Sequence, residues 1–189
     1  MEQGALLRVE LQGKLLRIAR EAIYAYLTRK KIQETETLEP ELLAKRGAFV
    51  TLKKGNALRG CMGQIEGTQS LYKLIRAVAI GAATRDPRFP PLKEDELKDI
   101  QIEISVLSSF QKISDPGLIQ IGFHGILVKR GLLSGLLLPQ VATEYGWDAL
   151  TFLEHTCRKA YLPGEVWKHP ETEVYIFTAQ VFKEEPTFE

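Results

Sequence analysis

The sequence predicts an α+β fold with largely antiparallel strand pairing, and three observations carry this prediction. Apolar residues recur every three or four positions over residues 9–31, which is the period of an amphipathic helix. Residues 100–106 alternate between isoleucine or valine and polar side chains, which is the period of a half-buried strand. Helical and extended segments also follow one another in mixed order, unlike the strict alternation of a parallel sheet.

The first half of the chain predicts two helices around a hairpin. The first helix covers residues 9–31, and Pro40 can open a short helical turn that ends at Leu43. Extended residues from 47 to 53 and from 57 to 65 flank Lys54-Gly55-Asn56, which has the composition of a hairpin turn. A second helix is expected over residues 69–84, and the three prolines in residues 85–91 end it.

The second half predicts a strand, a hairpin, a helix and a last strand. The strand covers residues 100–106, and the hairpin joins residues 124–129 to 132–138 around Arg130-Gly131. Asp148 can cap a helix over residues 149–161. The last strand is expected as one segment over residues 174–182, apolar on both faces apart from Thr178 and Gln180. Residues 183–189 are expected to form a loose tail.

Length and composition limit the class of protein without identifying a function. The chain has 189 residues, 44% of them hydrophobic, which is enough for one domain or two small packed ones. Its 25 Lys and Arg balance 24 Asp and Glu, for a formal net charge of +1. The apolar fraction excludes a disordered chain, and the charge balance does not favour nucleic acid as a partner.

The cysteines and the apolar segments favour a cytoplasmic protein. Cys61 and Cys157 cannot make a dense disulfide framework, and two reduced thiols are favoured over a single bridge between them. The N-terminal segment carries Glu2 and Glu10 and lacks the apolar core of a signal peptide. The most apolar run, residues 132–139, is far shorter than the roughly 20 residues of a membrane span. The chain also lacks the common phosphate-binding, nucleophile and metal motifs, so no metal site is expected.

One segment has residues suited to nucleophilic chemistry: Arg59-Gly60-Cys61-Met62-Gly63. In an extended strand Arg59 and Cys61 share a face, and Gly60 and Gly63 allow a ligand to approach closely. A neighbouring cation lowers the pKa of a thiol, so Cys61 is a candidate nucleophile or redox thiol. The alternative is that Cys61 is a small buried apolar residue and that the glycines serve strand packing.

Two further segments are candidates for substrate binding or proton transfer. Asp86-Pro87-Arg88-Phe89 follows the second helix, and a rigid loop that presents Asp86 and Arg88 can orient an anionic or planar substrate. The alternative is a helix terminator in which Asp86 starts a turn and Arg88 pairs with a surface carboxylate. His124 lies between glycines at the start of a strand, where it is either a general base or a structural residue.

These segments resemble the AMMECR-type domain family. Leu58-Arg59-Gly60-Cys61-Met62-Gly63 is similar to the family hexapeptide Leu-Arg-Gly-Cys-Ile-Gly, with Met62 in place of isoleucine. Tyr161 stands where the family pattern has glycine before Leu162-Pro163. The other matching segments are 47–51, 86–89, 103–107, 124–126, 136–142, 146–148, 157–160 and Trp167, so that the resemblance covers about residues 10–182.

The resemblance implies a single domain, residues 1–189, with two closely packed subdomains. The larger part would hold an antiparallel sheet flanked by helices, and a smaller strand-rich part would close a cleft. It also implies Memo-like and radical-SAM proteins as partners. The family motif residues that it carries over to this chain are Arg59, Cys61, Asp86, Arg88 and His124.

Two functional hypotheses remain open. In the first, the protein is an enzyme or an enzyme component: Cys61 and His124 are catalytic, and Arg59, Gly60, Gly63, Asp86 and Arg88 bind a nucleotide, an RNA base or a small anionic substrate. In the second, the same residues form the surface of a non-catalytic binding or adaptor module. The cofactor, if there is one, is unknown from the sequence.

Overall fold

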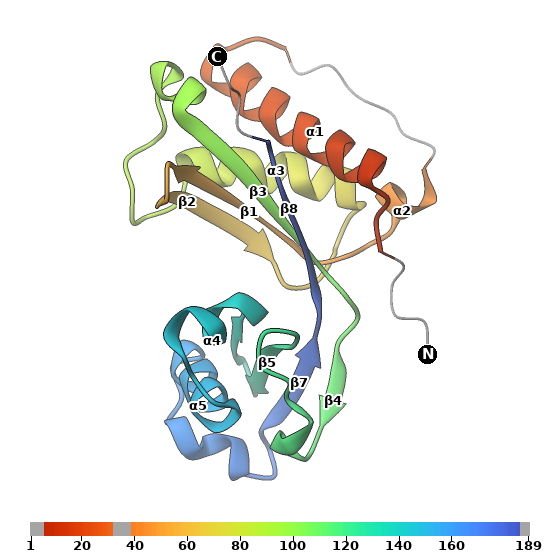
Figure 1. The fold of residues 1–189 in the computed structure, drawn as a ribbon, viewed down its shortest axis with the longest axis vertical. Coiled ribbons are helices and arrows are strands. Elements are labelled where there is room, and N and C mark those ends of the chain that lie inside the picture. The colour runs from red at the N-terminus through yellow and green to blue at the C-terminus, as the bar shows by residue number, and fades with distance from the viewer. Residues whose placement is uncertain (1–5, 32–38, 186–189) are drawn as a thin grey trace. The chain divides into compact units, whose positions relative to one another are not determined.

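The structure is a computed structural model that describes residues 6–31 and 39–185, and the chain divides into two compact units. The first unit is formed by Met1–Val106 with Gln180–Glu189, and the second by Leu107–Ala179. Each unit has its own four-stranded sheet and its own hydrophobic core (Figure 1). All the strand pairs with a defined register are antiparallel, which confirms the α+β prediction.

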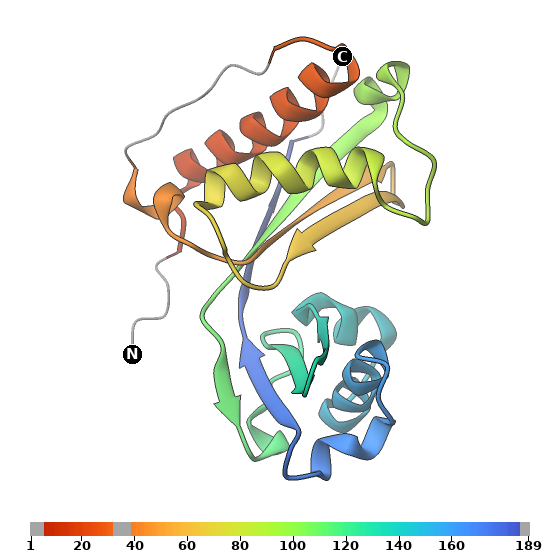
Figure 2. The same cartoon turned by 180° about the vertical axis from the view of Figure 1, so that it is seen from behind.

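The sheet of the first unit has the strand order β2-β1-β3-β8. Its strands are β1 (Ala48–Lys54), β2 (Ala57–Gln64), β3 (Ile100–Leu107) and β8 (Ala179–Lys183). Helices α1 (Val9–Leu27) and α3 (Leu71–Thr84) lie side by side on one face of this sheet (Figure 2). A short helix α2 (Pro40–Leu43) and a 3-10 helix η1 (Glu94–Asp99) complete the unit.

The period-two pattern of the strands separates the two faces of this sheet. Val50, Leu52, Ile102 and Ile104 are fully buried on the helix-covered face, and they form one core with α1 and α3. The residues between them on β1 and β3 are only partly buried, and several are polar. The helix-covered face therefore holds the first unit together, and the opposite face carries the polar side chains.

The second unit packs helices against a sheet of order β4-β7-β5-β6. The strands are β4 (Gln111–Ile113), β5 (Gly125–Arg130), β6 (Leu133–Leu137) and β7 (Glu173–Phe177). The helices are α4 (Pro139–Tyr145) and α5 (Ala149–Lys159), with 3-10 turns η2 (Pro116–Leu118) and η3 (Gly164–Lys168). Phe152, Leu153 and Cys157 of α5 are fully buried against this sheet. The Asp148 side chain caps α5 by accepting a hydrogen bond from the Thr151 backbone N–H at 2.7 Å, as expected.

The predicted last strand is wrong as a single element. Residues 174–182 are divided between β7 and β8, which belong to different sheets. The break falls at Thr178, whose backbone N–H donates to Ser108 Oγ and whose carbonyl accepts from the Ser108 N–H, both at 2.9 Å. An apolar run long enough for one strand thus supplies both sheets, because the chain changes unit within it.

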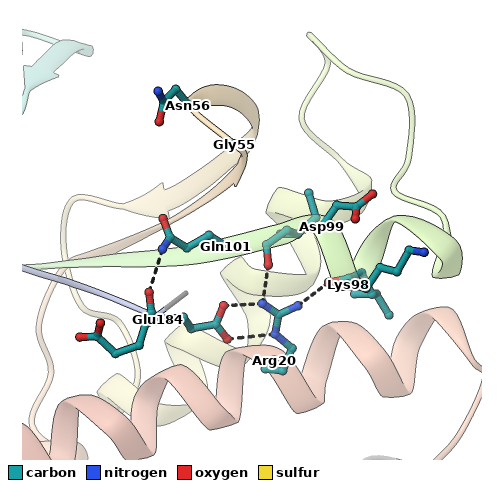
Figure 3. Close-up of a pocket in the computed structure, with 10 residues that line it drawn as sticks. Arg20, Gly55, Asn56, Lys98, Asp99, Gln101 and Glu184 are labelled. Carbon is teal, nitrogen blue, oxygen red and sulfur yellow. Dashed lines mark hydrogen bonds and ion pairs between the residues drawn. The ribbon is translucent and has the colours of Figure 1, made fainter. Parts of the chain in front are cut away.

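The expected tail begins later than Lys183, which ends β8. The two carboxylate oxygens of Glu184 accept hydrogen bonds from the guanidinium of Arg20 on α1. The same guanidinium donates to the carbonyls of Leu97 at 2.8 Å and Ile100 at 2.6 Å (Figure 3). These groups line a cavity of about 600 Å³. Its arginine is satisfied by these acceptors, so we interpret the cluster as a clamp that holds the end of β8 to α1. Residues 186–189 lie outside the described residues.

Tyr161 adopts the left-handed backbone conformation, with φ of +60°, directly after α5. A Cβ atom crowds the backbone in this region, so glycine is the favoured residue there. This geometry fits the glycine that the family resemblance implies at the position where this chain has tyrosine. The Tyr161 side chain is almost fully exposed and so offers little packing in compensation.

We expect Tyr161→Gly to stabilise the protein by about 1 kcal/mol, since it removes a left-handed non-glycine residue. Urea unfolding followed by circular dichroism measures this difference. The matched control is Tyr26→Gly, which changes an exposed tyrosine inside α1 and should cost about 1 kcal/mol. Equal destabilisation by both substitutions would contradict the prediction.

Candidate functional site

The residues singled out in the first unit meet where the end of α3 reaches the strand β2. Helix α3 ends at Thr84 because Pro87, Pro90 and Pro91 follow it and cannot continue a helix. The Asp86 carbonyl accepts a hydrogen bond from the Phe89 N–H at 3.2 Å, which closes a tight turn. The Leu92 N–H then donates to the Ala83 carbonyl at 2.7 Å, so that the loop returns to the helix and is fixed at both ends.

The Asp86 carboxylate is the centre of this site. It is 5% exposed, and it accepts four hydrogen bonds. Its Oδ2 accepts from the Cys61 backbone N–H at 2.8 Å and from Arg88 Nη2 at 2.7 Å. Its Oδ1 accepts from the Arg88 backbone N–H at 3.1 Å and from Arg88 Nε at 3.0 Å. The Arg88 guanidinium, followed by these backbone donors, holds the pKa of Asp86 well below its usual range.

This carboxylate also closes an open strand edge. Strand β2 is the end strand of its sheet, so backbone N–H groups on its outer side have no neighbouring strand. Asp86 supplies the missing acceptor to Cys61, and it does so from a loop that is 25 residues further along the chain. The site is therefore part of the fold and does not depend on a bound ligand for its shape.

Close packing requires glycine at both glycine positions of the hexapeptide. A Cβ atom at Gly60 would lie 2.2 Å from the carbonyl oxygen of Ala82, so only glycine lets the last turn of α3 rest on β2. A Cβ atom at Gly63 would lie 2.2 Å from the ring of Phe49 on the neighbouring strand. Gly60 thus brings Asp86 within reach of Cys61, and Gly63 makes room for an aromatic ring.

Arg59 is the extra residue of a β-bulge, which the sequence did not predict. Lys53 pairs with Leu58 and Leu52 pairs with Gly60, so Arg59 has no partner on β1. The bulge interrupts the alternation that would have placed Arg59 and Cys61 on the same face. The expectation that Arg59 activates the thiol is therefore not supported.

The Arg59 guanidinium binds an acidic side chain of η1 instead. Its Nε and Nη2 atoms donate to the two carboxylate oxygens of Glu96 at 2.9 and 3.0 Å, and Nη1 donates to the Pro90 carbonyl at 3.0 Å. The arrangement is bidentate, which is the strongest geometry for an arginine and a carboxylate. Arg59 thus joins β2 to η1 and to the proline-rich loop.

Cys61 is partly buried, and its environment keeps the thiol neutral. Thr51 lies opposite Cys61 on β1, and its hydroxyl donates to Sγ at 3.4 Å. Burial raises the pKa of the Cys61 thiol, and this effect exceeds the lowering by the Thr51 hydroxyl and by the charge of Arg88. Asp86 and Glu103 act in the raising direction as well. The thiolate that a nucleophile requires is disfavoured here.

His124 belongs to the second unit, whereas the other candidate residues belong to the first. Its Nδ1 atom accepts from the backbone N–H of Gln120 at 3.1 Å, and the backbone N–H of His124 donates to the Gln120 carbonyl at 2.9 Å. Burial lowers the pKa of His124, so the imidazole is neutral at pH 7. These bonds close the turn before β5, and they give His124 a structural role that is independent of catalysis.

Sequence reasoning missed Thr51 and Glu96. Counting outward from the hairpin turn places Thr51 opposite Gly60, and only the bulge at Arg59 moves Cys61 into that position. Glu96 lies in η1, and no short motif joins it to Arg59. The described residues contain no group of three or more His, Cys, Asp or Glu side chains arranged to hold a metal ion. No helix in the described part of the chain is long and apolar enough to cross a membrane.

The chain matches the family model AMMECR1 over residues 16–182. It belongs to the AMMECR1 family. Protein MK0488 of Methanopyrus kandleri is 48% identical to it, over 96% of this chain and 92% of that protein. Protein PF1979 of Pyrococcus furiosus is 45% identical, over 90% of this chain and 87% of that protein.

A crystal structure of the same family has the same fold. The uncharacterized protein PH0010 of Pyrococcus horikoshii superposes with a TM-score of 0.88 and 42% sequence identity, and the match covers 95% of this chain and 94% of that one. The names of these relatives state no activity.

We expect Asp86→Asn to destabilise the protein by about 2 kcal/mol at pH 7, because an amide NH₂ would face one of the donors that now bind the carboxylate. The folded-state pKa of Asp86 lies below the unfolded value of about 3.9. Its stabilisation is thus present above pH 4 and is lost as the pH falls further. Urea unfolding should show the full difference at pH 5 and 7 and a smaller one at pH 3. Asp115→Asn, an exposed helix cap, is the control and should change little. A difference between wild type and variant that does not depend on pH would contradict the assignment.

We expect the Cys61 thiol to react with iodoacetamide at least about tenfold more slowly at pH 7 than a free cysteine derivative, with an apparent pKa above that of the unfolded chain. Cys157 is fully buried, so the reaction of the folded protein reports on Cys61. Cys61→Ser is the control and should abolish the reaction. Rapid alkylation between pH 6 and 7 would show instead that the thiol is activated.

Proposed function

We propose that this AMMECR1 protein is a non-catalytic binding module that recognises a carboxylate or phosphate group of a partner protein through Arg88. The observation that carries the proposal is the way in which Asp86 holds the guanidinium. Nε and Nη2 of Arg88 both donate to the buried carboxylate, while the side chain of Arg88 remains 55% exposed.

The donors that Asp86 leaves free are suited to an oxyanion. A guanidinium has five N–H groups in a fixed plane, and Asp86 takes one from Nε and one from Nη2. Both N–H groups of Nη1 and the second one of Nη2 have no partner among the described residues. Nη1 and Nη2 together present two parallel donors at the end of the side chain, which matches the spacing of carboxylate or phosphate oxygens.

Preorganisation makes this arginine different from an ordinary surface arginine. A free arginine loses rotamer entropy when it binds an anion, and Asp86 has already restricted Arg88. The Phe89 ring, whose centre lies 5.5 Å from Cζ of Arg88, supports the guanidinium from a second direction. The surrounding loop is fixed by the Leu92 to Ala83 hydrogen bond, so the donors have a defined direction.

The geometry gives less support to the enzyme hypothesis. The thiol of Cys61 has a raised pKa, and Arg59 is bound to Glu96. The Memo-like and radical-SAM proteins implied by the family resemblance are, in this proposal, the proteins that present the anionic group. We also propose a cytoplasmic location, supported by two free cysteines, which a reducing compartment maintains.

We expect Arg88→Ala to weaken binding to such a partner at least about tenfold, and Arg88→Lys to weaken it nearly as much, since lysine lacks the parallel donors. Isothermal titration calorimetry with purified Memo-like and radical-SAM proteins from the same genome measures this loss. Arg158→Ala is the matched control, because Arg158 is 53% exposed and also paired with an acid, Glu154.

The same titration of Cys61→Ser, together with a test of its function in cells, separates the two hypotheses. A binding module retains partner affinity and function in cells after Cys61→Ser, whereas a thiol enzyme loses its function. Unchanged affinity in Arg88→Ala, with loss of function in Cys61→Ser, would overturn the proposal.

A further inference from the structure

Strand β2 has backbone groups on its outer side that point away from its sheet. It is an end strand of that sheet (Figure 1), so only its inner side pairs with β1. The Cys61 N–H points to the outer side, because it donates to Asp86. In an antiparallel strand the N–H and C=O of one residue point to the same side, and alternate residues share that side. The register with β1 is regular from Cys61 to Gly63, so the Cys61 carbonyl and both backbone groups of Gly63 also point outward.

The second half of this outer edge is open. Within residues 6–31 and 39–185, no hydrogen bond is made by the Cys61 carbonyl or by the N–H and carbonyl of Gly63. Gly63 is only partly buried, and Gln64 after it is exposed. A glycine also has no side chain that could cover the backbone. Unpaired N–H and C=O groups on an edge strand can bind an extended peptide as an added strand.

The proline-rich loop lies along the first half of the same edge. Its Pro90 carbonyl accepts from Arg59 Nη1 at 3.0 Å, and its Asp86 carboxylate accepts from the Cys61 N–H at 2.8 Å. Asp86 thus occupies the position of the acceptor that a neighbouring strand would offer to Cys61. An added strand can therefore reach Cys61, but it cannot continue along β2 beyond that residue.

The added strand would stop beside Arg88, whose guanidinium binds the same Asp86 carboxylate. A strand antiparallel to β2 reaches this point with its C-terminus, whereas a parallel strand would bring its N-terminus there. The free donors of Arg88 suit a carboxylate and repel an ammonium group. We infer that the partner binds through an extended C-terminal segment, which pairs with β2 at Gly63 and places its terminal carboxylate on Arg88.

This inference rests on the proposed function, and it names the part of the partner that Arg88 recognises. The segment would make three backbone hydrogen bonds to β2. Its terminal residue donates to the Cys61 carbonyl, and its third residue from the end exchanges two bonds with Gly63. The backbone bonds supply affinity for any extended chain, and the terminal carboxylate restricts binding to a chain end.

The probe for the test is the tetrapeptide acetyl-Thr-Val-Thr-Val with a free terminal carboxylate, since these residues favour an extended backbone. In a ¹H–¹⁵N spectrum of the full chain we expect the peptide to shift the Gly63 amide signal in a saturable manner at about millimolar concentration. The amide of Ser134 is the control, because Ser134 is exposed on β6, an end strand of the other sheet. Its signal should stay in place.

Two modified peptides separate the backbone bonds from the charge. A C-terminal amide removes the carboxylate, and N-methylation of the third residue from the end removes the N–H that pairs with Gly63. Each change should weaken binding at least about fivefold. Arg88→Ala should weaken binding of the unmodified peptide to a similar extent. Arg158→Ala removes another exposed arginine that is paired with an acid, and it should change nothing.

The outcomes distinguish this inference from the proposed function. Full affinity of the N-methylated peptide, with loss of binding in Arg88→Ala, would overturn the added strand and leave recognition by Arg88 in place. Full affinity of the C-terminal amide would show that no terminal carboxylate is bound, and would also overturn the inference. So would a Gly63 signal that does not move up to about 20 mM peptide. The titration of Arg88→Ala with the partner proteins tests the proposed function separately.

Discussion

The buried carboxylate of Asp86 is the interaction on which the rest of the candidate site depends. Taking a carboxylate out of water is costly unless its oxygens are fully hydrogen-bonded, and four N–H donors meet this requirement. These donors come from β2 and from the loop itself. The Asp86 side chain therefore pairs with an open strand edge, stabilises the turn after α3 and fixes the orientation of Arg88. The absence of a side chain at Gly60 is the condition for this contact, because any Cβ there would push α3 off the strand.

Burial strengthens the hydrogen bonds of the Asp86 carboxylate, but it also disfavours the thiolate that Cys61 would need as a nucleophile. A low-dielectric environment favours a carboxylate only when cations and N–H groups surround it, whereas only the Thr51 hydroxyl and the charge of Arg88 favour the thiolate of Cys61, and burial outweighs both. The charges of Asp86 and Glu103 further oppose a thiolate. Within this site, the groups that remain available to a ligand are therefore the outer donors of Arg88. In the proposed function the role of the hexapeptide is then mainly structural, because it holds Arg88 in place.

The sequence allowed the local elements to be predicted well and the site only in part. Periodicity located α1, α3, α5 and both hairpins to within a few residues, since these depend on neighbouring side chains. The local pattern does not predict the bulge at Arg59 or the break at Thr178, and the hydrogen-bond partners found there lie far along the chain: Glu96 for Arg59 and Ser108 for Thr178. The prolines after α3 predict the turn at Asp86. No pattern in the sequence predicts the contact between the Asp86 carboxylate and the backbone of Cys61.

Volume alone is a poor guide to a binding site in this fold. The cavity beside Arg20 has a volume of about 600 Å³, yet its guanidinium is satisfied by Glu184 and two carbonyls, so a ligand would have to displace existing bonds. The outer face of Arg88 differs, because Asp86 satisfies only part of its donors. A ligand gains hydrogen bonds there without breaking any. In the first unit the candidate binding group is therefore the one whose hydrogen bonds the fold leaves incomplete.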